Sequence, residues 1–423
     1  MSKYNTFIFK SYDFDVASKT LTLMYGYDDA LSFTETFTFN FDFADYNQEA
    51  LDRACQILFF IAGVSYYKAF LAPQIRIEAG EINEQLAAFL GETYQKGLGE
   101  FFYVNQLDPR TSITFPTTTD NILNMLSING QGSLVGIGGG KDSLVSVEWL
   151  RNQSDITTWS VGHKPQLEPL VQRIDLPHLW IERQWDRQLL DLNKNGAYNG
   201  HIPISAILAS VGTVVAVLSG KRDVVVSNEQ SANEETLLYQ DIEINHQYSK
   251  SSAFEEAYQT ILQSSFGDSL RYYSLLRPFS ELRISELFAH SAFEKYKDVF
   301  CSCNRTFTHD SHKMSWCGEC PKCAFVFLAL TPFVDRVELE KLWGKNLLLD
   351  PSLEILYRQL LGIEGDKPLD CVGEVKESRS AMQLAFEMYP ELGKKYQFEI
   401  PTDYNWRALS RDALPDDIQL TFE

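Results

Sequence analysis

Basic residues are under-represented in this sequence of 423 residues. It has 37 lysines and arginines against 57 aspartates and glutamates, which gives a formal net charge of -20 at pH 7. Proteins that bind nucleic acid usually neutralise its phosphates with clustered lysines and arginines. A local basic patch is compatible with this charge, but we expect a small molecule as the substrate and no nucleic acid among the partners.

The sequence also lacks the marks of export and of membrane insertion. Its first residues, MSKYNTFIFKSYDF, contain no basic stretch followed by an apolar core, so we expect no signal peptide. One uncharged run, residues 202–220, approaches the length of a membrane span. It contains Pro203, serines and glycines, however, and leads directly into a strand pattern. We therefore expect a helix buried in the core of a cytoplasmic protein.

Cysteine is scarce outside one cluster. Five of the seven cysteines lie between residues 301 and 323, in the run CSCNRTFTHDSHKMSWCGECPKC, a grouping typical of metal binding in a reducing compartment rather than of disulfides. The candidate ligands are Cys317, Cys320 and Cys323 in C-x-x-C-x-x-C spacing, Cys303 or Cys301 as the fourth, and His309 and His312 in reserve. Four sulfur ligands favour structural zinc, with Cys303 preferred as the fourth; an iron–sulfur cluster and free thiols are the alternatives.

The first part of the chain predicts a small α+β N-terminal domain. Residues 1–107 begin with alternating strand patterns up to about residue 45 and continue with helical patterns at 48–71 and 82–98. Residues 108–125, rich in Pro, Thr and Asp, are the predicted linker.

Residues 126–334 then alternate between strand and helix. The expected strands are 134–137, 157–161, 178–181 and 224–227, and the expected helices between them include 142–151, 166–173 and 204–219. This alternation predicts an α/β domain, a parallel sheet with helices on both faces, whose ligands bind beyond the carboxyl ends of the strands. Residues 335–423 predict a helical or irregular extension without a recognisable motif.

A glycine-rich run, SLVGIGGGKDSLVSVEWL at 133–150, joins the first of these strands to the first helix. The ATPase loop G-x-x-x-x-G-K-[ST] needs a glycine where this chain has Val135 and a hydroxyl residue where it has Asp142. The dinucleotide loop G-x-G-x-x-G fails too, because Lys141 stands at its third glycine. What remains is a strand-to-helix turn whose N–H groups wrap an anion at the positive end of a helix.

The residues of this turn are assigned to ATP and its metal ion. Gly138, Gly139 and Gly140 form the candidate cradle, Lys141 adds a charge, Asp142 is the candidate magnesium ligand, and Ser143 follows. The run resembles the PP-loop of the N-type ATP pyrophosphatases, Ser-Gly-Gly-x-Asp-Ser, with Gly138 in place of the serine. That superfamily implies the adenine nucleotide alpha hydrolase-like fold. It also implies cleavage of ATP between the α and β phosphates, with transfer of AMP to a carboxylate or carbonyl oxygen.

Three further runs supply polar side chains. VVVSNEQSANEE at 224–235 ends a strand, and its candidates for the ligand-binding edge are Ser227, Asn228, Glu229, Ser231 and Asn233. LLRPF at 275–279 resembles the Arg-Pro-Leu segment that faces the nucleotide in these enzymes, so Arg277 is a candidate for contact with phosphate or adenylate. In INHQYSKSSAFEE at 244–256, His246 and Lys250 are candidate proton carriers, although an ordinary loop before a helix explains this run equally well.

The order of SNEQSANE, NHQYSKS and CGECPKCAFVF, behind a β-rich domain and a GIGGGKDS loop, resembles the UDP-N-acetylmuramoyl-L-alanyl-L-glutamate epimerases of bacterial wall synthesis. The resemblance implies that ATP and magnesium adenylate the α-carboxylate of the terminal L-Glu and release pyrophosphate. A side-chain base then removes the α-proton, and reprotonation and hydrolysis give the D-Glu product and AMP. His246, Lys250 and Cys301 are the candidate bases.

Other functions are compatible with the same motifs. The Cys-Gly-x-Cys-x-x-Cys ending also resembles a nitrile-forming PP-loop synthase of the queuosine pathway, which implies a small heterocyclic carboxylate as the substrate. A tRNA-modifying PP-loop enzyme is a second alternative, disfavoured by the acidic charge. The third is an ATP-binding sensor without catalytic activity.

Overall fold

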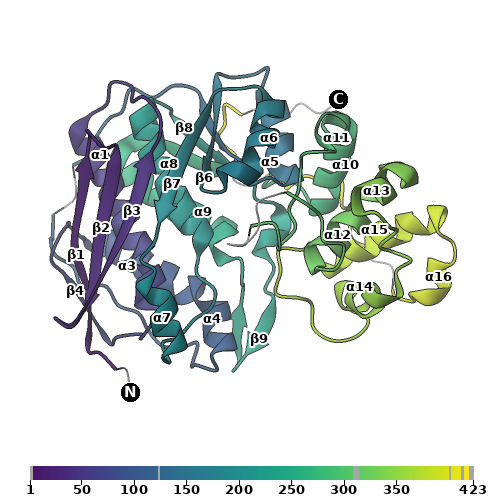
Figure 1. Ribbon diagram of the computed structural model, residues 1–423, viewed down its shortest axis with the longest axis horizontal. Helices are drawn as coiled ribbons and strands as arrows, with labels where there is room; N and C mark the ends of the chain where they lie inside the picture. The colour runs from purple at the N-terminus through teal and green to yellow at the C-terminus, as the bar shows by residue number, and fades with distance from the viewer. Residues whose placement is uncertain (1–2, 122–123, 308–313, 400–401, 411–413, 419–423) are drawn as a thin grey trace.

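The computed structural model describes residues 3–121, 124–307, 314–399, 402–410 and 414–418. One mixed sheet runs through it in the order β11-β8-β5-β6-β7-β3-β2-β1-β4 (Figure 1). Its strands are β1 (Thr6–Asp15), β2 (Thr20–Tyr27), β3 (Leu31–Phe39), β4 (Gln74–Ile77), β5 (Ser133–Gly136), β6 (Ile156–Val161), β7 (His178–Gln184), β8 (Asp223–Val226) and β11 (Arg271–Ser274). A separate antiparallel pair joins β9 (Leu237–Tyr239) to β10 (Ile242–Ile244).

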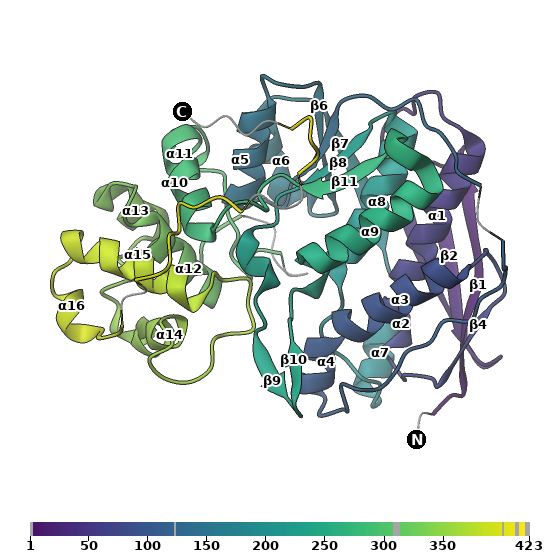
Figure 2. The same ribbon diagram turned by 180° about the vertical axis from the view of Figure 1, so that it is seen from behind.

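Strands β11, β8, β5, β6 and β7 run parallel, and helices cover both faces of this half of the sheet. Successive residues of a strand point to opposite faces, so Leu134 and Val224 belong to one buried cluster, and their neighbours Val135 and Val225 to the other. The first cluster takes in α1 (Gln48–Ala62), α3 (Glu84–Gly97), α8 (Ile204–Ser219) and α9 (Ser252–Phe266), seen in Figure 2. The second takes in α5 (Lys141–Leu150), α6 (Lys164–Ile174), α10 (Glu281–Ser291) and α12 (Pro321–Leu330). The predicted α/β sheet with helices on both faces is confirmed.

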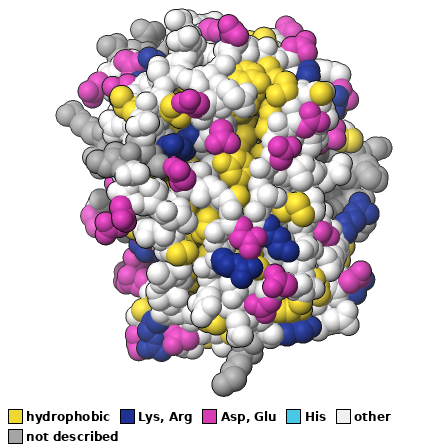
Figure 3. Space-filling view, turned by 90° about the vertical axis from the view of Figure 1, so that its left-hand side faces the viewer, with side chains coloured by type: hydrophobic (Ala, Val, Ile, Leu, Met, Phe, Trp, Pro, Cys, Tyr) yellow, Lys and Arg dark blue, Asp and Glu magenta, His cyan; other side chains and the backbone are white. Residues whose placement is uncertain are grey.

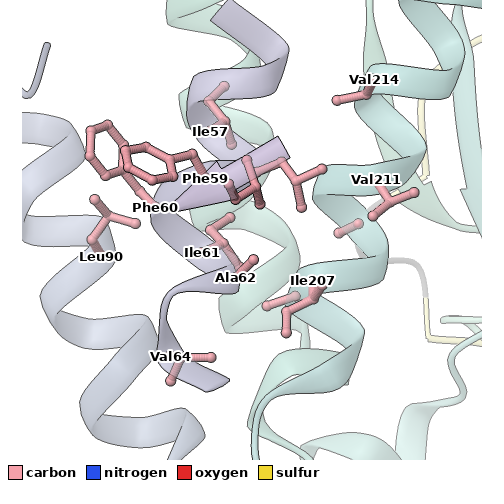
Figure 4. Close-up of a cluster of buried hydrophobic side chains, with 14 of the residues drawn as sticks. Ile57, Phe59, Phe60, Ile61, Ala62, Val64, Leu90, Ile207, Val211 and Val214 are labelled. Atoms are coloured by element: carbon pink, nitrogen blue, oxygen red, sulfur yellow. The ribbon is translucent and has the colours of Figure 1, made fainter. Parts of the chain in front are cut away.

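Helix α8 is the uncharged run noted in the sequence. Its side chains at Ile207, Val211 and Val214 recur at helical spacing and lie towards α1, as Figure 4 shows. On the sheet side, a Cβ at Gly212 would lie 2.8 Å from the side chain of Val224, so glycine allows the helix to approach β8 closely. The predicted burial of this helix is confirmed. None of the helices in the described part of the chain is long and apolar enough to cross a membrane.

The N-terminal strands extend the same sheet. Strand β3 pairs antiparallel with β7, with Phe37 opposite Arg183, and β2, β1 and β4 follow in turn. The buried carboxylate of Glu35 accepts a hydrogen bond from Nε of Arg183 at 2.5 Å across this junction. Because these partners are 148 residues apart, a strand pattern in the sequence gives no indication of the pairing. The domain boundaries near residues 107 and 126 remain a prediction, and strands from both sides of them share one sheet.

The helix expected at 48–71 is interrupted. Helix α1 ends at Ala62, and α2 (Val64–Tyr67) follows after Gly63. A Cβ at Gly63 would come within 2.5 Å of the ring of Phe9, so the chain packs directly against β1 at this point. Glycine is also among the residues least favourable to a helix interior. The predicted length was therefore wrong, because close packing and low propensity coincide at one residue.

The C-terminal part is helical, and it lies on the right of Figure 1. It contains α13 (Arg336–Trp343), α14 (Glu354–Leu360), α15 (Val375–Met388) and α16 (Leu392–Lys395). Helix α15 packs against α12 and α10. Because α10 also packs against α5, the C-terminal part lies next to the helix that follows β5. The shorter helices elsewhere are α4 (Gly99–Val104), α7 (Gln188–Lys194) and α11 (Phe293–Tyr296). On the opposite side of the molecule, acidic and basic side chains are interspersed with hydrophobic ones (Figure 3).

We expect Arg183→Met to destabilise the fold, because the substitution leaves the Glu35 carboxylate buried without its partner. Loss of one member of a buried ion pair costs about 3–5 kcal/mol in the free energy of unfolding. Urea denaturation measures this cost. The double variant Glu35→Leu with Arg183→Met should recover most of the loss, since both charges are then gone. An Arg183→Met variant as stable as the parent would contradict a role for the pair in joining β3 to β7.

Candidate functional site

Three of the polar runs predicted from the sequence meet at one edge of the sheet. Strands β5, β8 and β11 are parallel neighbours, so their carboxyl ends lie side by side. The glycine-rich loop, residues 137–140, follows β5; residues 227–233 follow β8; and Arg277 follows β11. Ligands of parallel sheets bind at this edge. The three loops therefore form one candidate site.

The glycine-rich loop is shaped for a backbone cradle. Gly139 has φ of +93°, a conformation that favours glycine. A Cβ there would lie 2.9 Å from the carbonyl oxygen of Cys301, whose N–H donates to the Gly139 carbonyl at 2.8 Å. A Cβ added to Gly138 would meet no atom of the described residues within 4 Å, so the loop borders open space. Gly140 is the N-cap residue of α5, and no side chain caps the helix there. The first N–H groups of the helix are therefore left for an anion.

Lys141 is buried and paired with two carboxylates. Its Nζ lies 2.6 Å from Oε2 of Glu281 and 2.5 Å from Oδ1 of Asp142. Burial alone would lower the pKa of Lys141, but Asp142 and Glu281 outweigh burial and raise it. Burial raises the pKa of Asp142 to about 6; Glu281 adds to the rise and Lys141 opposes it. The lysine charge is thus neutralised inside the protein, while Asp142 keeps part of its side chain exposed.

The five predicted residues after β8 all lie at this edge, with different partners. Ser227 Oγ is 2.8 Å from Ser146 Oγ on α5, which ties this loop to the helix of the glycine cradle. The carbonyl of Asn228 accepts from Ser274 Oγ at 2.6 Å, and Oδ1 of Asn233 accepts from the N–H of Ser252 at 2.7 Å. Glu229 and Ser231 are buried, and Ser231 Oγ has no hydrogen-bond partner in the described part of the chain.

Arg277 lies inside the site and contacts protein groups. Its guanidinium donates to Oε2 of Glu255 at 2.7 Å, to the carbonyl of Glu229 at 2.8 Å and to the carbonyl of Lys250 at 2.5 Å. The side chain is 2% exposed. These contacts hold the loop after β8 against the Lys250 segment. The predicted contact of Arg277 with phosphate or adenylate stays a prediction.

Lys250 and His246 are brought together with a cysteine from the C-terminal part. Nζ of Lys250 donates to the sulfur of Cys371 at 3.2 Å. His246 Nδ1 lies 2.6 Å from Thr236 Oγ1, and its buried Nε2 has no partner among the residues described. Burial lowers the pKa of His246 to about 4, helped by Lys250, so the imidazole is neutral at pH 7.

Lys250 itself remains a cation. Burial would lower its pKa, but the electrostatic interactions with Cys371, Glu229 and Asp142 outweigh burial and raise it. An ammonium group that keeps its proton at neutral pH stabilises negative charge nearby and is a poor base. The prediction that Lys250 acts directly as the base is therefore less well supported than a role as the cation beside Cys371.

Four cysteines form a compact group. The sulfurs of Cys303, Cys317, Cys320 and Cys323 all lie within 4.8 Å of one another, and the Cys303–Cys320 and Cys317–Cys323 distances are 3.9 and 3.7 Å. Tetrahedral zinc with bonds of about 2.3 Å separates its sulfur ligands by about 3.8 Å. The predicted set is confirmed as a group able to hold a metal ion. The alternative ligand, Cys301, has its sulfur beside Thr306 Oγ1 instead, and His309 and His312 lie outside the described residues.

Comparisons with known proteins find matches to both parts of the chain. Family models match the MurL N-terminal domain over residues 1–275 and the MurL C-terminal domain over residues 299–395. The chain belongs to the MurL family. It is 40% identical to the UDP-N-acetyl-alpha-D-muramoyl-L-alanyl-L-glutamate epimerase of Xanthomonas oryzae pv. oryzae, over 90% of this chain and 85% of the relative. The epimerase of the same name from Salinispora tropica is 38% identical, over 92% of this chain and 86% of the relative. No solved structure matches the chain.

The site draws on both MurL domains. The N-terminal match holds the glycine-rich loop and Lys250, the C-terminal match holds the cysteine group and Cys371, and Glu281 lies between the two matches. No motif in the sequence indicates Glu281 or Cys371. A signal for Cys371 existed, since it stands outside the cysteine cluster in the loop-like run GDKPLDCVG, and functional residues are frequent in loops.

We expect Cys317→Ser to lower the zinc content of this MurL chain, because one thiolate of a four-sulfur group is lost. Metal analysis of purified protein should give about one zinc per chain for the parent and far less for the variant. Cys301→Ser is the matched control and should keep its zinc, since Cys301 lies outside the group of four. A zinc-free parent of full stability would contradict the assignment of the metal.

Proposed function

We propose that this chain epimerises the terminal L-glutamate of UDP-N-acetylmuramoyl-L-alanyl-L-glutamate, with ATP as a co-substrate that is split into AMP and pyrophosphate. The observation that carries the proposal is an identity of 37–40% to relatives with this printed activity, over about nine-tenths of the chain. The open glycine-rich loop beside Asp142 supports the use of ATP. The reaction would belong to the PP-loop class and take place in the cytoplasm. Its substrate would be a small molecule.

The loop would hold the phosphates of ATP through backbone N–H groups. The uncapped start of α5 and the open space beside Gly138 fit an anion. Among the described residues, the four cysteines are the only group of three or more potential metal ligands. Mg²⁺ is commonly bound by one or two carboxylates together with the phosphates themselves. Asp142, partly exposed at the loop, fits that requirement.

Adenylation explains why an epimerase would consume ATP. Removal of the α-proton beside an ionised carboxylate creates a dianion, which makes that proton very weakly acidic. Attachment of AMP to the α-carboxylate removes its charge, and the acyl carbonyl can then accept the electron pair of the C–H bond. The ammonium of Lys250 would stabilise the charge that develops on this oxygen. Hydrolysis after reprotonation gives the epimer and AMP.

The four-cysteine group would hold structural zinc close to this chemistry. The carbonyl of Cys301 meets Gly139, and a Cβ at Gly140 would lie 3.2 Å from the side chain of Ser302. Both residues immediately precede Cys303 of the zinc group. A metal ion at this position would fix the segment that supports the back of the glycine-rich loop.

We expect Asp142→Asn to reduce turnover roughly 100-fold or more, because the charged ligand for magnesium is lost. The assay measures pyrophosphate release from ATP with UDP-N-acetylmuramoyl-L-alanyl-L-glutamate, and chiral analysis of the glutamate after acid hydrolysis. Asp155→Asn is the matched control: this exposed side chain pairs with Lys221, before β6 and away from the site, and its loss should leave turnover unchanged. Pyrophosphate release with a deazaguanine carboxylate or tRNA, and none with the muramyl substrate, would contradict the proposed function.

A further inference from the structure

We propose that Cys371 and Glu100 are the two proton carriers of the epimerisation, acting on opposite faces of the glutamyl α-carbon. This inference rests on the proposed function, since it assigns the groups that move the α-proton after adenylation. It adds two residues that no sequence motif indicates, one from each MurL domain.

Cys371 has the surroundings of a reactive thiol. It is half-buried, and Nζ of Lys250 donates to its sulfur at 3.2 Å. Thiolates beside lysine or another cation are the form in which cysteines act as bases and nucleophiles. The backbone is held as well, because Nζ of Lys322 donates to the Cys371 carbonyl. Cys55, by contrast, is buried in the N-terminal core, where burial raises the pKa of the thiol and keeps it neutral.

Glu100 has the surroundings of a carboxyl group that exchanges protons near neutral pH. Its carboxylate, 19% exposed, lies 3.3 Å from Nδ1 of His201. Burial raises the pKa of Glu100 to about 7, and its electrostatic interactions with Cys371 and Asp370 add to the rise. A group with this pKa donates and accepts protons with similar ease at neutral pH, as a reversible epimerase requires.

Packing places Glu100 beside the segment that leads to Lys250. Gly99 meets β10, since a Cβ there would lie 2.9 Å from the side chain of Ile244. His246 follows two residues later, and its buried Nε2 has no partner within the described chain, which leaves a polar atom for a ligand to satisfy. Burial and the neighbouring His246 and Lys250 lower the pKa of His201 to about 4, and His201 lies 3.3 Å from Glu100, so Glu100 is on the side of this segment that carries His246 and Lys250.

This segment is also connected to the adenylation loop. Lys322, whose Nζ donates to the Cys371 carbonyl, lies 3.7 Å from Oε1 of Glu281, and Glu281 pairs with Lys141 at the start of α5. The Lys250 carbonyl accepts from Arg277, which also holds the Glu229 carbonyl of the loop after β8. A glutamyl group whose carboxylate is adenylated at the loop would present its α-carbon, one bond away, to this cluster.

The proposed step balances as two proton transfers. For one epimer, the Cys371 thiolate takes the α-proton: the C–H bond breaks, an S–H bond forms, and the electron pair moves onto the acyl carbonyl oxygen. The Glu100 carboxyl group then gives its proton to the other face of the α-carbon and becomes a carboxylate. The opposite epimer uses the pair in reverse. Before the next turnover of the same epimer, Cys371 loses its proton to solvent and Glu100 takes one up from solvent.

Deuterium exchange tests the assignment. With ATP in D₂O, the parent should place deuterium at the α-carbon of both epimers and interconvert them. Cys371→Ser and Glu100→Gln should each invert neither epimer, at least 100-fold below the parent. Each variant should still exchange the α-proton of one epimer, because it keeps the proton carrier on one face of the α-carbon. The epimer that exchanges should differ between the two variants. Pyrophosphate release should persist in both.

The controls separate this inference from the proposed function. Cys55→Ala and Glu49→Gln change the same residue types in α1, away from the site, and should epimerise like the parent. Inversion at the parental rate by either Cys371→Ser or Glu100→Gln would overturn the assignment. Loss of pyrophosphate release along with exchange would place these residues in adenylation and overturn it as well. A parent that releases no pyrophosphate with the muramyl substrate would instead defeat the proposed function.

Alkylation tests the Lys250–Cys371 pair without turnover. Iodoacetamide should modify Cys371 of the folded protein much faster than Cys55, as mapped by mass spectrometry. Lys250→Met removes the cation beside the sulfur and should slow modification of Cys371 roughly tenfold. Equal rates for the parent and Lys250→Met would overturn the pairing.

Discussion

The buried ion pair between Lys141 and Glu281 is the contact on which the candidate site depends. A lysine at the first position of a helix meets the positive end of the helix dipole, and burial of its ammonium costs several kcal/mol. Glu281, 1% exposed, offsets both effects at a distance of 2.6 Å. Its N–H donates to Glu377 of α15, and Lys322 of α12 lies beside its carboxylate. Glu281, on α10, therefore joins the start of α5 to α12 through its carboxylate and to α15 through its N–H group.

This junction brings together the two groups of residues that the proposed function needs. The glycine-rich loop and Asp142 lie at the open side of the sheet edge, where the proposed function would place the phosphates of ATP. Lys250 and Cys371 lie beside the loop after β8, and Arg277 holds this loop against the Lys250 segment by donating to the carbonyls of Glu229 and Lys250. Because Glu255 neutralises the charge of Arg277, this contact joins the two segments without adding net charge to the site.

The parallel sheet and the meeting of its loops could be predicted from the sequence, because apolar runs that alternate with helical patterns fix both the strand direction and the edge where ligands bind. The joining of β3 to β7 could not, since a buried pair such as Glu35 and Arg183 depends on residues 148 positions apart. Lys141 illustrates a second limit. A lysine beside glycines indicates a phosphate contact, and only the position of Glu281 reveals that its charge is already neutralised.

The C-terminal half contributes residues to the candidate site. Cys371 reaches Lys250, and the segment before Cys303 meets Gly139 and Gly140 from behind. A glycine-rich loop gains shape from what surrounds it, because glycine has the largest conformational entropy to lose on folding. A metal ion held by four thiolates in this segment would oppose that loss at the one loop that must keep its N–H groups aligned. Under the proposed function, the cysteine group would therefore help to shape the loop that holds the phosphates, without any of its sulfurs touching a substrate.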